Sequence, residues 1–215
     1  MSTAVEWMLL IHLLPLAVGA AVSPMVLVVQ LLNLSSVPRS AAFVLGSSLM
    51  VLIWLLCAGW IASLLPVAHP GPDPTAAAFN AVFALVLLVL ALRIAQQPLP
   101  ATPKPAAPGL WMPLLSGAVL MGCNLTSLVM FLPAVQDITR SGATGLQWWL
   151  WALLLALITL IPAWLPPAVV GLSGSRGHAL LLRLSSVVIP HQRGINVGIS
   201  LLLGLLLGAR ALLKV

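Results

Sequence analysis

The sequence predicts an all-α integral membrane protein with six transmembrane helices. Of its 215 residues, 61% are hydrophobic and only 6% are charged, whereas soluble domains are about 45–50% apolar and about 25% charged. A soluble protein of this length could neither bury so much apolar surface nor cover it with so few charges. The apolar runs are continuous and rich in Leu and Ala, which favours helices over the alternating strands of an outer-membrane barrel. The composition excludes a soluble enzyme, and the lack of any Lys/Arg run argues against nucleic acid as a partner.

Six apolar stretches are long enough to cross a bilayer, which takes about 20 mainly apolar residues in a helix. They are residues 5–32, 41–65, 75–97, 110–135, 147–172 and 195–213. The proline-rich stretch 69–74 predicts a turn between the second and third helices. The Pro/Ala-rich stretch 98–109 predicts a cytoplasmic linker between two three-helix halves, residues 1–97 and 110–215.

Polar residues, glycines and prolines concentrate in the helix that opens each half. The first helix carries His12, Pro15, Gly19, Ser23, Pro24, Gln30 and Asn33. The fourth carries Pro113, Ser116, Gly117, Gly122, Asn124, Thr126, Ser127 and Pro133. The second, third and sixth helices are plainer, and in the sixth we expect Gly204 and Gly208 to serve close packing. The fifth contains Thr159, Pro162, Pro166 and Pro167.

The interruptions of the first and fourth helices predict a binding site at the middle of the membrane. Unsatisfied polar groups cost several kcal/mol in hydrocarbon, so they face protein or a cavity. A proline also frees a backbone carbonyl one turn earlier, and paired breaks in the two halves indicate a transporter's midplane site. The candidate substrate-binding residues are Ser23, Pro24, Gln30, Asn124, Thr126 and Ser127. The alternative is that these residues only kink the helices and let them pack closely.

The cations predict the orientation of the chain. Six of them, Arg39, Arg93, Lys104, Arg176, Arg183 and Arg193, fall on one side of the six-helix topology. The other side holds Arg140, Arg210 and Lys214, with Glu6, Asp73 and Asp137. The positive-inside rule places the first set in the cytoplasm, so we expect both termini outside the cell. Residues 175–192 mix His and Arg with leucines, which favours an amphipathic helix on the cytoplasmic surface over a plain charged loop.

Several short motifs lie along nearly the whole chain. The first half contains AVGAAVSPMVLVVQLL and PRSAAFVLGSSL, with Ser23-Pro24, Pro38-Arg39 and the Phe43-to-Gly46 motif. The second half contains IPAWLPPAVV and GINVGISLLLGLLLGARAL. These motifs resemble the LysE transporter superfamily, and most closely its GAP family of Sap-like or peptidoglycolipid addressing proteins. Where that superfamily has Asn-Pro-Lys in the fourth helix, this chain has Asn124-Leu125-Thr126, so only the Asn matches.

The resemblance implies two inverted three-helix repeats in a bacterial cytoplasmic membrane and export of cargo. Amino-acid exporters of the superfamily carry an Asp just after the Gly-Pro of the first helix, where this chain has Met25. No Asp or Glu lies within a helix core here, and a hard cation would need charged oxygen ligands. We therefore expect no metal, no cofactor and an uncharged or anionic, largely apolar cargo. A glycolipid of the kind that the GAP family is associated with fits this description.

Several alternatives stay open at this point. A non-transporting assembly partner, LysE-type efflux of an amino acid or other small molecule, and a membrane-embedded enzyme are the other readings. The chain is not expected to be an enzyme, because its three acidic residues lie near helix boundaries and form no pair. It has no Walker motif to drive transport. His12 is the ionisable residue well inside a helix and is the candidate for proton coupling, unless it only hydrogen-bonds near the outer interface. Membrane lipids are expected partners, and small residues on the helix faces permit a homodimer.

Overall fold

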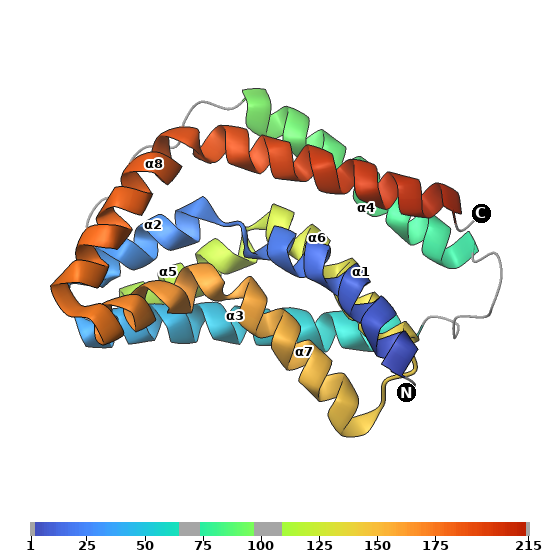
Figure 1. The fold of residues 1–215 in the computed structure, drawn as a ribbon, viewed down its shortest axis with the longest axis horizontal. Helices are drawn as coiled ribbons and strands as arrows, with labels where there is room; N and C mark the ends of the chain where they lie inside the picture. The colour runs from blue at the N-terminus through green and yellow to red at the C-terminus, as the bar shows by residue number, and fades with distance from the viewer. Residues whose placement is uncertain (1–2, 65–73, 97–108, 214–215) are drawn as a thin grey trace.

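Helices alone make up the regular structure of the described residues. The computed structural model describes residues 3–64, 74–96 and 109–213, and within these ranges it contains eight helices and no strand (Figure 1). The predicted all-α class is therefore confirmed. The turn at 69–74 and the linker at 98–109 lie outside the described residues except for their last positions, as do Asp73, Lys104 and Lys214.

Three continuous helices are long and apolar enough to cross a membrane. They are α3 (Val37–Ser63), α4 (Pro74–Gln96) and the final part of α8 (Ile161–Leu213), from Arg193 to Leu213. Up to three further spans are formed by pairs of helices that meet at a sharp bend. The described residues thus hold up to six spans, in agreement with the six predicted stretches.

The first two bent pairs are the interruptions that the sequence predicts. Helix α1 (Thr3–Ala21) meets α2 (Pro24–Asn33) at 55°, and α5 (Trp111–Gly122) meets α6 (Leu125–Arg140) at 67°. The third pair, α7 (Gly145–Thr159) with the first part of α8, bends by 72°. The sequence did not predict that break. Its cause is local: Pro162 has no N–H for the preceding turn, so α7 ends at Thr159 and a new helix begins.

Helix α8 is two helices joined at Gly174, whose φ of 55° and ψ of −131° lie outside the helical region. Only glycine adopts that conformation without strain. The chain turns there, rises through a second stretch of α8 and bends again, and its last part, from Arg193 to Leu213, then lies along α4 (Figure 1). Pro166, Pro167 and Pro190 lie inside α8 without ending it. The predicted surface segment, residues 175–192, is helical and largely exposed; its position on the membrane surface stays a prediction.

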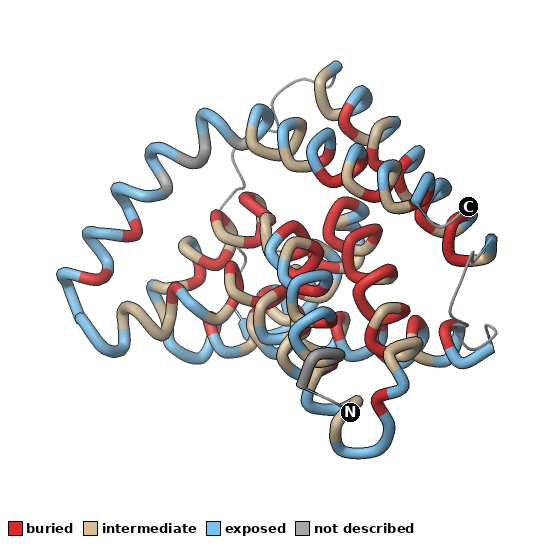
Figure 2. The backbone as a smooth tube through the Cα atoms, turned by 45° about the vertical axis from the view of Figure 1, so that its right-hand side comes forward, coloured by how far each residue is buried: buried red, intermediate tan, exposed pale blue. Residues whose placement is uncertain are grey.

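The two halves of the chain are interleaved. The most extensive helix pairs are α4 with α8, α3 with α5, and α1 with α6, and each pair joins one half to the other. Phe43, Leu16, Met130, Phe131 and Leu155 are fully buried between them. Exposed residues, many of them leucines, cover the outer faces (Figure 2). An apolar exterior around a packed interior is the arrangement that lipid requires.

Glycines bring the backbones of α3 and α5 into contact. A Cβ on Gly46 would overlap the carbonyl oxygen of Leu114, and one on Gly117 would overlap that of Phe43. The hydroxyl of Ser47 donates to the Gly117 carbonyl over 3.3 Å. In α8, a Cβ on Gly204 would lie 3.2 Å from Leu88 of α4. The predicted packing role is therefore confirmed for Gly204, whereas a Cβ on Gly208 would make only an ordinary contact with Ala84, at 3.9 Å.

Candidate functional site

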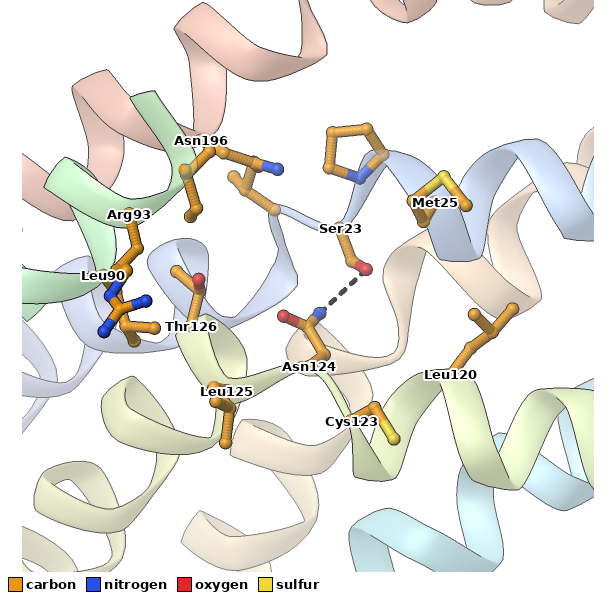
Figure 3. A pocket seen from close by; sticks show the side chains of 13 residues that line it. Ser23, Met25, Leu90, Arg93, Leu120, Cys123, Asn124, Leu125, Thr126 and Asn196 are labelled. Carbon is orange, nitrogen blue, oxygen red and sulfur yellow. Dashed lines mark hydrogen bonds between the residues drawn. The ribbon is translucent and has the colours of Figure 1, made fainter. Parts of the chain in front are cut away.

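The breaks in the first and second bent spans face each other inside the bundle. Ser23 precedes α2 at its N-cap position, with Pro24 as the first helical residue. Asn124 precedes α6 in the same way. The Asn124 Nδ2 donates to the Ser23 Oγ over 2.8 Å, and its Oδ1 accepts from the Ser127 N–H over 3.3 Å (Figure 3). One amide side chain therefore caps α6 and joins the two halves.

The cap of α2 differs from that of α6. The Ser23 side chain accepts no hydrogen bond from the N–H groups of α2; its oxygen accepts from Asn124. The first N–H groups of a helix have no partner within the helix and carry a partial positive charge. The first turn of α2 thus presents backbone donors that no side chain satisfies.

A cavity of about 410 Å³ lies at this crossing. Its lining includes the residues that start α2 and α6 and parts of α4, α5 and α8 (Figure 3). The lining residues are Val22, Ser23, Pro24, Met25, Leu90, Arg93, Ile94, Leu120, Cys123, Asn124, Leu125, Thr126 and Asn196. Polar groups gather around the Ser23–Asn124 hydrogen bond, while leucine and isoleucine side chains form much of the remaining wall.

Four of the six predicted substrate-binding residues line this cavity: Ser23, Pro24, Asn124 and Thr126. Gln30 and Ser127 do not. Gln30 is fully buried and donates to the Ser40 Oγ over 2.8 Å, which links α2 to α3. Ser127 is fully buried below Asn124, with its backbone N–H in the cap of α6.

Arg93 and Asn196 line the cavity but were not among the predicted site residues. From the sequence, Arg93 is expected only to flank the linker as one of the cytoplasmic cations. Arg93 lies in the last turn of α4 and Asn196 lies in α8, and the packing of α4 on α8 brings both to the crossing. An arginine one turn inside an apolar stretch, rather than beyond its end, was the available signal.

His12 lies away from the cavity. Its side chain is exposed on α1, and its backbone carbonyl accepts from Arg210 over 3.3 Å. Arg210 also forms an ion pair with Asp137 over 3.4 Å. Gln147 of α7 donates to Glu6 of α1 over 3.1 Å. These contacts tie α1, α6, α7 and α8 together at the end of the bundle opposite to the start of α3 (Figure 1).

A second, apolar groove lies between α3 and the first part of α8. Its volume is about 540 Å³, and its walls include Val37, Val44, Trp164, Pro167 and Val170. Among the described residues, no group of three or more His, Cys, Asp or Glu side chains is placed to hold a metal ion. A further pocket in α8 is lined by Pro190, His191, Arg193, Gly194 and Ile195.

A protein-family model matches most of the chain. The family model described as Sap, sulfolipid-1-addressing protein, matches residues 13–212. No curated protein and no solved structure matches the chain. The matched range includes both breaks, the cavity residues and the ion pair at the opposite end. The chain therefore belongs to the Sap, sulfolipid-1-addressing protein family.

Proposed function

We propose that the protein is an exporter that moves an amphipathic or lipid-linked cargo, such as a glycolipid, across the bacterial cytoplasmic membrane. The observation that carries the proposal is the meeting of two broken spans at a polar cavity inside an apolar bundle. Irregular backbone is tolerated at membrane depth only where it is buried in protein or lines a cavity. In transporters, such paired breaks form the substrate site.

The family supports a lipid as the cargo, because its members are described as addressing sulfolipid-1. The walls of the cavity agree with a lipid. Ser23, Asn124 and Thr126 supply hydrogen-bonding groups, and Leu90, Leu120 and Ile94 supply apolar contact. A headgroup would occupy the polar part, while acyl chains would extend along the apolar outer faces of the bundle.

The proposed mechanism is alternating access around the Ser23–Asn124 hydrogen bond. In our proposal the two halves are inverted repeats of the LysE superfamily kind, and rocking of one repeat against the other opens the cavity to each side in turn. The cation-rich helix ends would face the cytoplasm and both termini the outside. His12 would accept the coupling proton if transport is driven by a proton gradient. Asp137 and Arg210 would help to hold the outer end closed.

Lipid translocation in proteoliposomes tests this function. A fluorescently labelled glycolipid should cross the bilayer faster with the protein than in empty vesicles, as measured by chemical quenching of the outer leaflet. Ser23→Ala and Asn124→Ala should each slow this flux at least about tenfold. Ser63→Ala is the matched control, because the Ser63 hydroxyl is exposed and bonds only within its own helix. Flux unchanged by both site variants would refute the site, and no flux above empty vesicles would refute the transport function.

A further inference from the structure

Two serine hydroxyls next to the crossing are fully buried and unpaired. Ser127 of α6 and Ser200 of α8 are each 0% exposed, and neither Oγ has a hydrogen-bond partner in the part of the chain that the structure describes. A buried hydroxyl without a partner is costly, so each one indicates a ligand. We propose that both hydroxyls and the last carbonyls of α1 bind a sodium ion. Its use as the coupling ion, in place of a proton at His12, rests on the proposed function, whereas its binding does not.

Both serines lie one turn from the point where α1, α6 and α8 meet. A Cβ on Gly19 of α1 would overlap the side chain of Leu203 in α8 and would lie 3.3 Å from the Sδ of Met130 in α6. Ser127 precedes Met130 by three residues. Ser200 precedes Leu203 by the same interval. Residues three apart in a helix are neighbours on its surface, so both serines belong to the faces that meet at Gly19.

The ion pair at the far end of the bundle shows in which direction the serines lie from Gly19. Arg210 of α8 pairs with Asp137 of α6 and donates to the His12 carbonyl of α1. Between this level and that of Gly19, each helix advances by seven residues, upward in number along α1 and downward along α6 and α8. Helix α1 is therefore antiparallel to the other two. The same direction leads on to the cavity at the break of the first span (Figure 3). The two serines thus lie between the Gly19 contact and the cavity, at the level where α1 ends.

The end of α1 supplies oxygen atoms that accept no hydrogen bond. Helix α1 ends at Ala21, the Val22 N–H donates to the Gly19 carbonyl over 3.2 Å, and Pro24 has no N–H to donate. Among the described residues, no N–H donates to the carbonyls of Ala20 and Ala21. The last carbonyls of a helix point beyond its end and carry a partial negative charge. Free acceptor oxygens at this level favour a cation as the ligand.

Neutral oxygen ligands favour a singly charged ion. Ca²⁺ and Mg²⁺ are bound largely by carboxylates, and no Asp or Glu lies within a turn of Ser127, Ser200 or Ala21 in the sequence. Transporters with broken helices bind Na⁺ through unwound carbonyls and half-helix C-terminal ends. The Ser127 N–H already caps α6 through Asn124, which leaves its hydroxyl oxygen for the ion. Arg93 lines the cavity but is exposed, so its repulsion of the ion is screened.

Binding of radioactive sodium to the purified full chain in a neutral detergent tests the site. Saturable binding is expected, and K⁺ should displace the label at least about tenfold less well than Na⁺ does. Ser127→Ala and Ser200→Ala should each weaken binding at least about tenfold, because each removes one ligand. Ser186→Ala is the matched control in α8, since that hydroxyl is exposed and bonds only within its own helix. It should bind sodium as the unmodified protein does.

Thermal unfolding separates a ligand role of the serines from a packing role. In choline chloride, Ser127→Ala and Ser200→Ala should melt at or above the temperature of the unmodified protein, because each removes an unpaired buried hydroxyl. Replacing choline by Na⁺ at the same ionic strength should raise the midpoint of the unmodified protein by at least about 2 °C and leave both variants unchanged. Variants that melt lower in choline would assign the serines to packing and overturn the proposal.

The binding data can also overturn the site directly. A folded protein without saturable sodium binding, or binding that survives in both serine variants, would remove it. Equal effects of Na⁺, K⁺ and choline would show a general salt effect. Because binding is measured without transport, bound sodium without lipid flux would refute only the proposed function, and lipid flux without bound sodium would refute only the sodium site.

Discussion

The amide of Asn124 donates a hydrogen bond of 2.8 Å to the hydroxyl of Ser23, a residue 101 positions earlier in the chain. Each residue stands at the start of a half-helix that follows a break in a membrane span. The contact therefore fixes the point where the two halves of the protein cross. The same Asn124 side chain caps α6, whereas no side chain caps α2.

Removing this contact should destabilise the protein by a measurable and coupled amount. Hydrogen bonds between membrane helices contribute about 0.6 kcal/mol on average and at most about 1.7 kcal/mol. A double-mutant cycle with Ser23→Ala and Asn124→Ala should give a coupling free energy in this range. Asn124→Ala should cost more than Ser23→Ala, because it also removes the cap on the Ser127 N–H. Unfolding in mixed micelles measures these values, and strict additivity would contradict the contact.

Gly46 and Gly117 should tolerate no side chain. A Cβ at either position would overlap a carbonyl oxygen of the neighbouring helix, so Gly46→Ala and Gly117→Ala should each destabilise the fold by about 1–3 kcal/mol. Gly198→Ala is the matched control in an exposed part of α8, where nothing lies within 4 Å of the added carbon. It should be neutral or stabilising by up to about 1 kcal/mol. Equal melting temperatures of all three variants would show that α3 and α5 do not approach closely.

The two cysteines should differ in their reaction with charged thiol reagents. Both are exposed, but Cys123 lines the cavity and Cys57 lies on the apolar outer face of α3. In single-cysteine variants, a sulfonate-bearing methanethiosulfonate should label Cys123 and leave Cys57 unreacted in a bilayer. The anionic reagent should also label Cys123 faster than its trimethylammonium analogue, because Arg93 and two helix N-termini attract it. A faster cationic reagent would contradict a positive cavity.

The Asp137–Arg210 ion pair should stabilise the end of the bundle to which the chain termini belong. The two side chains are 25% and 19% exposed, so we expect Asp137→Asn to cost only about 0.2–1 kcal/mol. Hydrogen exchange at the C-terminal ends of α6 and α8 should become faster in this variant. Exchanging the charges with Asp137→Arg and Arg210→Asp should restore part of the protection. Arg176→Gln changes an exposed arginine outside the ion pair and should leave hydrogen exchange unchanged. An equal loss of protection in Arg176→Gln would show that the effect does not depend on the ion pair.

His12 provides the test of proton coupling. If its imidazole carries the coupled proton, His12→Gln should abolish the dependence of lipid flux on an imposed pH gradient while leaving binding intact. The exposed position of the side chain on α1, away from the cavity, makes a direct effect on binding unexpected. Proteoliposomes with an acidic or neutral interior measure the dependence. Unchanged gradient dependence in the variant would end this assignment.

The sequence was sufficient to predict up to six candidate spans and two of the three bends, because Ser23-Pro24 and Asn124 mark helix starts through their own local chemistry. The third break, before Pro162, was not predicted. Pro162 lies at the start of a new helix, whereas Pro166 and Pro167, one turn later, lie inside the same helix without interrupting it. A proline at the start of a helix and one within it look alike in a single sequence. The outcome depends on how neighbouring helices satisfy the freed backbone.

The candidate site could be predicted in part, for a similar reason. Residues next to the breaks were found, because a break exposes its own neighbours. Arg93 was missed as a site residue, since it reaches the cavity only through the packing of α4 on α8. Gln30 was expected in the site but binds Ser40 instead. Which face of an interrupted helix meets a cavity is decided by tertiary contacts that local patterns do not contain.

The interleaving of the two halves has a consequence for how the protein is made. Helices α1 to α4 are synthesised before any of α5 to α8, yet their most extensive partners are α6, α5 and α8. Until these arrive, the notch at Gly46 and Ser47 has no backbone to contact and Ser23 has no amide to bond. The newly made first half therefore lacks its main packing partners within the bilayer, and its contact faces stay open to insertion factors and to quality-control proteases. A chain that ends in the linker should therefore be degraded.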